Sequence, residues 1–269
     1  DDAALNEVML SQISGAASSC CPELTPFVAQ VGGFDALFGA LERFDDNPDV
    51  MMSAWRGLSD HAHNAFGTEV IANHGGPMQG VHFLVEQMRI HPEPGLAENP
   101  YDHLSLKYEI MQNINGMLEH DAGDKYGAAF LREGFHEQLL YSMRLEPDLR
   151  ATQDVACSCM VRLMMHDPLA AKVLANGGAV KLAVDAVKNF RDKRDETEWC
   201  GTTLEAAYPV VPLCSGALVM LAGADPANAD EMLKLGLLGE LRKISRPVFA
   251  LSVAPLRALL GLRALKKPR

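Results

Sequence analysis

Paired glycines interrupt helix-forming runs at regular intervals along this chain of 269 residues. VLANGGAV (173–180), VAQVGGFDAL (28–37) and VIANHGGPM (70–78) carry two glycines each, and FLREGFHEQL (130–139) and MLKLGLLGEL (232–241) are looser copies. We take the last glycine of each pair and one glycine of each looser copy as the reference position, which gives Gly33, Gly76, Gly134, Gly178 and Gly236. The gaps between them are 43, 58, 44 and 58 residues, so a short and a long unit alternate. Periods of about 40–47 residues are typical of stacked helical repeats.

The residues around each break predict a short helix, a corner and a longer helix. Apolar residues follow the first glycine pair at helical spacing, at Phe34, Leu37, Phe38 and Leu41. We expect the glycine to adopt the left-handed conformation that ends the short helix, because it has no Cβ to clash there. After the second pair, Pro77 is expected to begin the next helix.

A third helix is expected in each unit, ending in a pattern such as ALVML (217–221). An Asp follows each of these patterns within a few residues, and it is expected to cap the next short helix. These residues are Asp60, Asp121, Asp167 and Asp225.

Composition supports an all-α fold without a membrane span. Hydrophobic residues make up 48% of the chain and aromatic residues only 6%, and Ala, Leu, Val and Met dominate. No stretch reaches about 18 uninterrupted apolar residues, so we expect a soluble protein that is not transmembrane. The first residue is Asp1, which leaves a removed targeting peptide possible.

The six cysteines favour an intracellular, reducing compartment, either the cytoplasm or the interior of an organelle. They form no CxxC pair and no spacing typical of a disulfide framework, so we expect buried thiols. They are Cys20, Cys21, Cys157, Cys159, Cys200 and Cys214.

The triplet of a short helix, a glycine, a helix of the form GAVKLAVDAV and a helix ending in ALVML resembles the armadillo repeat. The resemblance covers about residues 22–262; HEAT repeats are the near neighbour, but they have two helices and lack this glycine corner. It implies an all-α, right-handed α-α superhelix of about four full repeats plus a partial C-terminal one, in a single domain (1–269). Residues 1–21 would then hold an N-terminal capping helix, and residues 241–269 a basic C-terminal cap or tail.

The resemblance also implies that partners bind along the surface of the third helices. In the nuclear-import adaptors of the armadillo family, a Trp and an Asn four residues apart recur there. The Trp positions map to Ser53, Glu109, Ser158 and Gly216, and the Asn positions to Gly57, Asn113, Arg162 and Met220. Only Asn113 matches, which argues against import-adaptor function; Asn113 and Arg162 remain candidate partner contacts. Trp55 falls at a core position, where packing is its expected role.

Two insertions lengthen alternate units, at residues 89–104 and 190–205. Equivalent insertions in a solenoid emerge on the same edge, so these loops are candidate partner contacts. Their candidate residues are Tyr101, His103, Arg191, Lys193, Arg194 and Trp199. The alternative is that Pro92, Pro94 and Pro100 only stiffen a spacer.

Charge divides the chain into an acidic body and a basic tail. Residues 1–240 carry a formal charge of −19, whereas the chain from Leu241 onward has eight basic residues and no acidic one. The tail includes the candidate contacts Arg263, Lys266 and Lys267. It could cover the acidic end of its own body or bind an anionic partner, such as another subunit, RNA or a membrane surface. Since only the tail is basic, nucleic-acid binding is not expected.

No pattern predicts catalysis, a metal site or a cofactor. His61, His63 and His74 lack the three or four converging ligands of a zinc site, and no GxSxG, Walker, HExxH or GxGxxG motif is present. We therefore expect no enzyme, no small-molecule substrate, no metal and no cofactor.

Three functions follow, in order of preference. The first is a non-catalytic protein-binding scaffold, a structural or adaptor subunit of a larger assembly whose partners are other protein subunits. The second is a free adaptor that binds an extended basic peptide in an acidic concave groove. The third is a lyase-like enzyme built on helical repeats.

Overall fold

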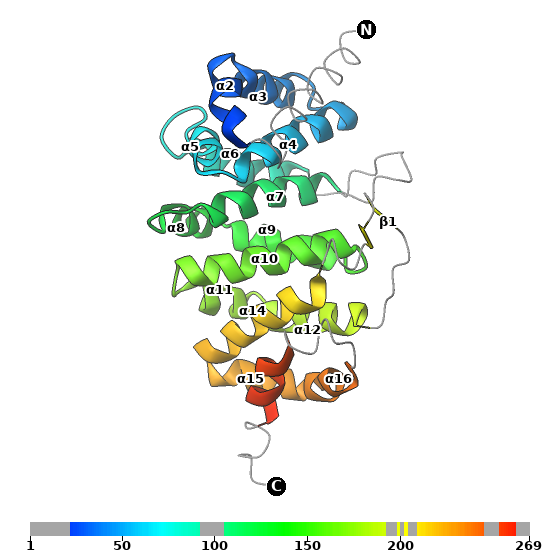
Figure 1. Cartoon of the computed structure of the whole chain (residues 1–269). Helices are drawn as coiled ribbons and strands as arrows, with labels where there is room; N and C mark the ends of the chain where they lie inside the picture. The colour runs from blue at the N-terminus through cyan, green and yellow to red at the C-terminus, as the bar shows by residue number, and fades with distance from the viewer. Residues whose placement is uncertain are drawn as a thin grey trace. The chain divides into compact units, whose positions relative to one another are not determined.

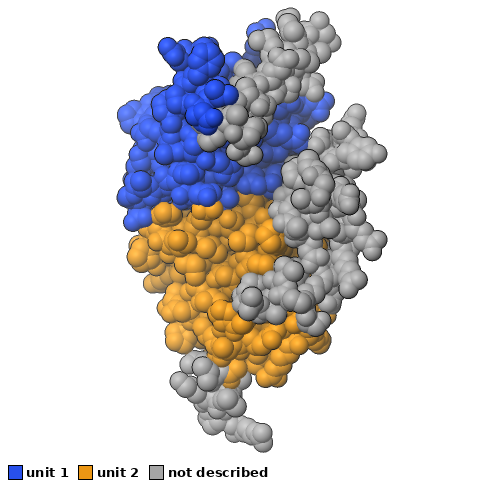
Figure 2. Space-filling model, in the orientation of Figure 1, with its two compact units in different colours: residues 1–138 blue, residues 139–269 orange. Residues whose placement is uncertain are grey.

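The computed structural model describes residues 22–91, 105–191, 198–199, 202–203, 209–244 and 253–261, and these are almost entirely helical (Figure 1). The only strands in these ranges are the antiparallel pair β1 (Glu198–Trp199) and β2 (Thr202–Thr203). The chain forms two compact units, unit 1 (residues 1–138) and unit 2 (residues 139–269), shown in Figure 2. No helix of the described ranges is long and apolar enough to cross a membrane.

The helices come in triplets, and in the first four triplets the order is short, intermediate, long. After the 3-10 helix η1 (Pro22–Leu24), the first helices are α2 (Thr25–Gln30), α5 (Ala65–Ala72), α8 (Lys125–Arg132), α11 (Ala170–Asn176) and α15 (Pro226–Lys234). The second helices are α3 (Gly33–Arg43), α6 (Gln79–Ile90), α9 (Phe135–Leu145), α12 (Ala179–Phe190) and α16 (Leu237–Lys243). The third helices are α4 (Pro48–Ala62), α7 (Leu106–Glu119), α10 (Arg150–His166) and α14 (Val210–Ala224), and helical residues 253–261 take the same place in the last triplet. The predicted triplets of helices are confirmed.

Left-handed glycines stand at four of the five corners, immediately before the second helix. Their φ values are +79° at Gly32, +82° at Gly134, +90° at Gly178 and +77° at Gly236. At the first corner the prediction chose the wrong glycine, since Gly33 is already the first residue of α3. A Cβ on Gly33 would lie 2.4 Å from Val28 Cγ1, so this glycine allows close packing rather than a turn.

The remaining corner is longer: Gly75 and Gly76 have positive φ values of +75° and +138°, but neither directly precedes the second helix. Met78, with φ of +62°, takes the left-handed position before α6, and the helix begins at Gln79 rather than at Pro77 as predicted. The Asn73 side chain supports this turn: its Oδ1 accepts a hydrogen bond from Met78 N at 3.2 Å, and its Nδ2 donates to Glu69 Oε1 at 2.8 Å. These two hydrogen bonds hold a residue that is not glycine in a conformation that usually requires one.

Three of the four predicted aspartate caps accept backbone hydrogen bonds near the start of the next short helix. Asp225 Oδ1 accepts from Ala227 N at 2.8 Å, Asp167 Oδ1 accepts from Leu169 N at 2.8 Å, and Asp121 Oδ2 accepts from Tyr126 N at 2.9 Å. The prediction is wrong at Asp60, because Asn64 caps α5 and accepts from Gly67 N at 2.8 Å.

In unit 1 the core lies between successive helices of the triplets. Trp55 on α4 is fully buried and its ring lies 5.9 Å from that of Phe83, which confirms the predicted packing role. Burying a side chain of this size contributes about 3 kcal/mol or more to folding. The core of this unit therefore holds α3, α4 and α6 together.

In unit 2 a disulfide joins the two neighbouring third helices. Cys157 on α10 and Cys214 on α14 are both fully buried, and their Cα atoms are 4.9 Å apart. The prediction of buried thiols is therefore wrong for this pair, although Cys159 is buried and not part of a disulfide. The reducing compartment remains a prediction, because one disulfide does not identify a compartment.

Candidate binding site

The third helices of unit 1 expose a charged surface. Ser53, Arg56 and Asp60 share one exposed or half-buried side of α4. Arg56 Nε donates a hydrogen bond to Glu109 Oε1 of α7 at 2.9 Å, and His63 Nδ1 lies 3.7 Å from Glu119 Oε2. One ion pair, between Arg56 and the buried Glu109, thus joins α4 to α7 along this surface.

The third helices of unit 2 expose a more apolar surface. Met165 on α10 is 68% exposed, and a Cβ on Gly216 of α14 would lie 3.8 Å from Val161 Cγ2 of α10. The half-buried side chains of the two helices are otherwise mainly aliphatic, with Ser158, Arg162 and His166 the polar members on α10. They include Val161, Leu213, Val219 and Met220.

Asn113 is not an exposed contact, contrary to the prediction. Its side chain is fully buried, and Nδ2 donates to Trp55 O at 3.1 Å and to Glu109 O at 2.9 Å. It therefore joins α7 to α4. Gly57, the equivalent position on α4, is also buried. It packs against α3 so closely that a Cβ there would lie 2.6 Å from Leu37 Cδ2. Arg162 is half-buried on α10 and stays a candidate contact.

The structure does not gather the remaining predicted contacts into one site. Arg191 follows α12 and forms an ion pair with Glu240 of α16, which ties it into unit 2. Trp199 lies in β1. The others fall outside the described residues: Tyr101, His103, Lys193, Arg194, Arg263, Lys266 and Lys267.

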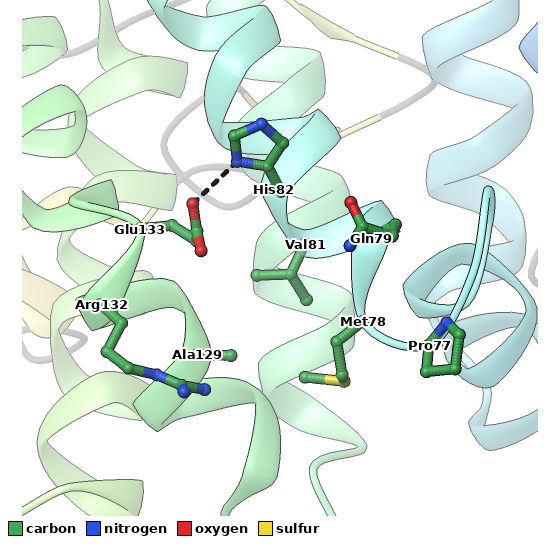
Figure 3. A pocket seen from close by; sticks show the side chains of 8 residues that line it. All are labelled: Pro77, Met78, Gln79, Val81, His82, Ala129, Arg132 and Glu133. Atoms are coloured by element: carbon green, nitrogen blue, oxygen red, sulfur yellow. Dashed lines mark hydrogen bonds and ion pairs between the residues drawn. The ribbon is translucent and has the colours of Figure 1, made fainter.

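A pocket that the sequence did not predict opens in unit 1 between the start of α6 and the end of α8 (Figure 3). Its volume is about 380 Å³. Figure 3 shows Arg132 and Glu133 on one side of the opening and residues 77–79 on the other. The eight lining residues are Pro77, Met78, Gln79, Val81, His82, Ala129, Arg132 and Glu133. Only the unusual length of the second break, GGPMQ, could have drawn attention to it.

The pocket has an apolar floor and a polar rim. Val81 and Ala129 are almost fully buried, with 1% and 4% of their surface exposed. His82 Nδ1 lies 2.8 Å from Glu133 Oε2, so the carboxylate of the rim already has a partner. Arg132 is exposed, and within the described parts of the chain its guanidinium makes no hydrogen bond or ion pair.

Two of the candidate histidines pack within unit 1. His61 is fully buried, its Nδ1 lies 3.2 Å from Thr25 Oγ1, and desolvation lowers its pKa to about 4. His74 stacks on Phe38 with ring centroids 3.5 Å apart, and burial lowers its pKa as well. No group of three or more possible metal ligands occurs in the described ranges.

Comparison with known proteins relates the chain to engineered helical proteins. No family model matches the sequence, and no curated protein matches it. Two crystal structures of engineered proteins from the Northeast Structural Genomics Consortium align with TM-scores of 0.71 and 0.67, each at 15% identity. The alignments cover 97% of this chain and 94% of the first protein, and 96% of this chain and 90% of the second. A third engineered protein has a TM-score of 0.62 at 16% identity. This alignment covers 96% of the present chain and 52% of the engineered protein. At such identities the likeness concerns the fold alone, and the shared fold is helical.

Proposed function

We propose that this chain is a non-catalytic, armadillo-type scaffold that serves as a structural or adaptor subunit of a larger protein assembly. The observation that carries the proposal is the fourfold recurrence of a short, an intermediate and a long helix, followed by a partial fifth triplet, with a left-handed corner before each second helix. A unit of this kind cannot bury its apolar faces alone, and stacking neighbours creates an extended surface for partners.

The third helices are the proposed partner surface. The apolar side chains of α10 and α14, with Met165 the most exposed, suit a dry contact with a folded protein. In unit 1, the ion pair of Arg56 with the buried Glu109 suits a separate, polar contact. A scaffold with both kinds of surface favours a folded protein partner.

Native mass spectrometry of the tagged full chain, purified from its own cells at low and high salt, tests the proposal. We expect a stoichiometric complex that survives high salt. M165E should weaken the complex at least about tenfold, since it places a charge in an apolar contact. Tyr141→Glu is the matched control on α9, where the side chain is 41% exposed, and it should leave the complex intact. Isolation of the chain alone at both salt concentrations would count against a subunit role.

A second candidate is a free adaptor for extended basic peptides. The observation that favours it is the formal charge of −19 on residues 1–240, together with the half-buried Asp60 and the exposed Glu119 on the third helices of unit 1. Such binding is electrostatic and should be lost as salt rises. Many weak, salt-sensitive partners in the same experiment would favour this function over the first.

A further inference from the structure

We infer that the pocket between α6 and α8 binds a carboxylate group carried on a short aliphatic stem. The inference is independent of the third-helix surface, because the pocket is lined by a second helix, a first helix and the turns beside them. It concerns unit 1 alone.

The chemistry of the rim selects an anion. Arg132 presents a planar guanidinium that can donate two parallel hydrogen bonds to one carboxylate. In the described residues this group has no partner to displace. Glu133, the acidic residue of the pocket, has its carboxylate 2.8 Å from the His82 ring nitrogen. The Gln79 amide on the opposite side of the opening can donate a further hydrogen bond.

The floor of the pocket selects the stem. Val81 and Ala129 offer buried aliphatic carbon, and Met78 and Pro77 extend this surface on one side of the opening (Figure 3). A volume of about 380 Å³ is near the lower end of ligand pockets, which span about 300–1,000 Å³. The space therefore suits one amino-acid-sized group rather than a large cofactor.

A carboxylate fits better than a phosphate. A phosphate carries up to two negative charges, and the Glu133 carboxylate at the rim and the formal charge of −11 on the chain would both repel it. A phosphate also leaves the apolar floor uncovered. A singly charged group on an aliphatic stem satisfies both parts of the pocket.

Titration of the full chain with N-acetyl-leucine, followed by NMR of the backbone amides, tests the inference. We expect saturable shifts at Val81, Ala129 and neighbouring amides. N-acetyl-leucinamide, which lacks the charge, should bind at least about fivefold more weakly, and inorganic phosphate should not compete. Arg132→Gln should weaken binding of N-acetyl-leucine by a similar factor, and Arg132→Lys by less because the ammonium keeps the charge but not the fork.

The same titration provides a control variant and shows whether the bound carboxylate belongs to a polypeptide end or to a small free molecule. Arg43→Gln, on α3 of the same unit, removes an equal charge away from the pocket and should leave binding unchanged. Equal binding of N-acetyl-leucine and its amide, or no effect of Arg132→Gln in a chain with unchanged melting temperature, would overturn the inference. A peptide with a C-terminal leucine that binds at least tenfold more tightly than N-acetyl-leucine would identify a polypeptide end as the source. Equal affinities would identify a small free carboxylate.

Discussion

Alanine substitutions should have opposite effects on stability at two glycines of the first triplet, because only one of them lies in a left-handed corner. Gly32 has φ of +79° before α3, whereas Gly39 lies inside that helix. A Cβ on either glycine would meet no atom within 4 Å, so packing contributes nothing to the difference. Unit 2 offers the same comparison, with Gly236 at φ of +77° before α16 and Gly239 inside it, again with open space at both.

The expected magnitudes follow from two opposing effects. Alanine stabilises the native state by about 0.4–1 kcal/mol relative to glycine because its unfolded chain has fewer conformations. In the left-handed region alanine pays a steric cost of about 1–2 kcal/mol. Gly39→Ala and Gly239→Ala should therefore stabilise by roughly 0.5–1 kcal/mol, and Gly32→Ala and Gly236→Ala should destabilise by a similar amount.

Urea unfolding monitored by circular dichroism measures these stability differences. Gly32→Ala is compared with Gly39→Ala, and Gly236→Ala with Gly239→Ala. The gap within a pair should be about 1–2 kcal/mol, with an unchanged slope against urea. Gly178→Val should cost more than about 1 kcal/mol, since φ is +90° there and valine is β-branched. Equal stability of Gly32→Ala and Gly39→Ala, or of the second pair, would refute the left-handed corner as the element that ends the short helices.

Three further predictions concern buried groups. Replacing Cys157 and Cys214 by alanine should cost up to about 4 kcal/mol in the unfolding of unit 2, because the disulfide closes a loop across a separation of 57 residues; urea unfolding checks this against a Cys159→Ala control. His61 has a folded pKa of about 4, below its unfolded value near 6.5, so its contribution is complete above pH 6.5 and falls by about 3 kcal/mol as the pH drops to 4. H61Q should flatten this dependence, and an unchanged acid slope would contradict it. Burial raises the pKa of Asp154 to about 7, so its contribution is complete below about pH 4 and is lost as the pH rises to 7; D154N should therefore be the more stable protein at pH 8. Equal stability of D154N and the parent chain at pH 8 would show that Asp154 ionises without cost.

The sequence predicted the helix triplets because both signals that define them are local. Apolar spacing marks a helix face, and the φ of Gly134, Gly178 and Gly236 is a property of single residues. At the second corner the deciding contacts are the hydrogen bonds of Asn73 with Met78 and Glu69, which no local pattern reveals.

The site was less predictable because it depends on how separate helices meet. The disulfide requires Cys157 and Cys214, 57 residues apart, to face each other from two stacked helices. The pocket requires Arg132 at the end of one helix to lie near the start of another. The contact prediction failed at Asn113 because its side chain faces α4, where Nδ2 donates to Trp55 O, and spacing alone does not show which residues face a neighbouring helix.

The covalent link between α10 and α14 also limits how far the chain can be stretched. If the two ends of the molecule are pulled apart, the 57-residue segment between the bonded cysteines cannot extend. Fully extended, this segment would add about 200 Å to the length of the chain. A force acting on the assembled protein would therefore lengthen unit 1 much further than unit 2, until a reductant reached the buried sulfurs.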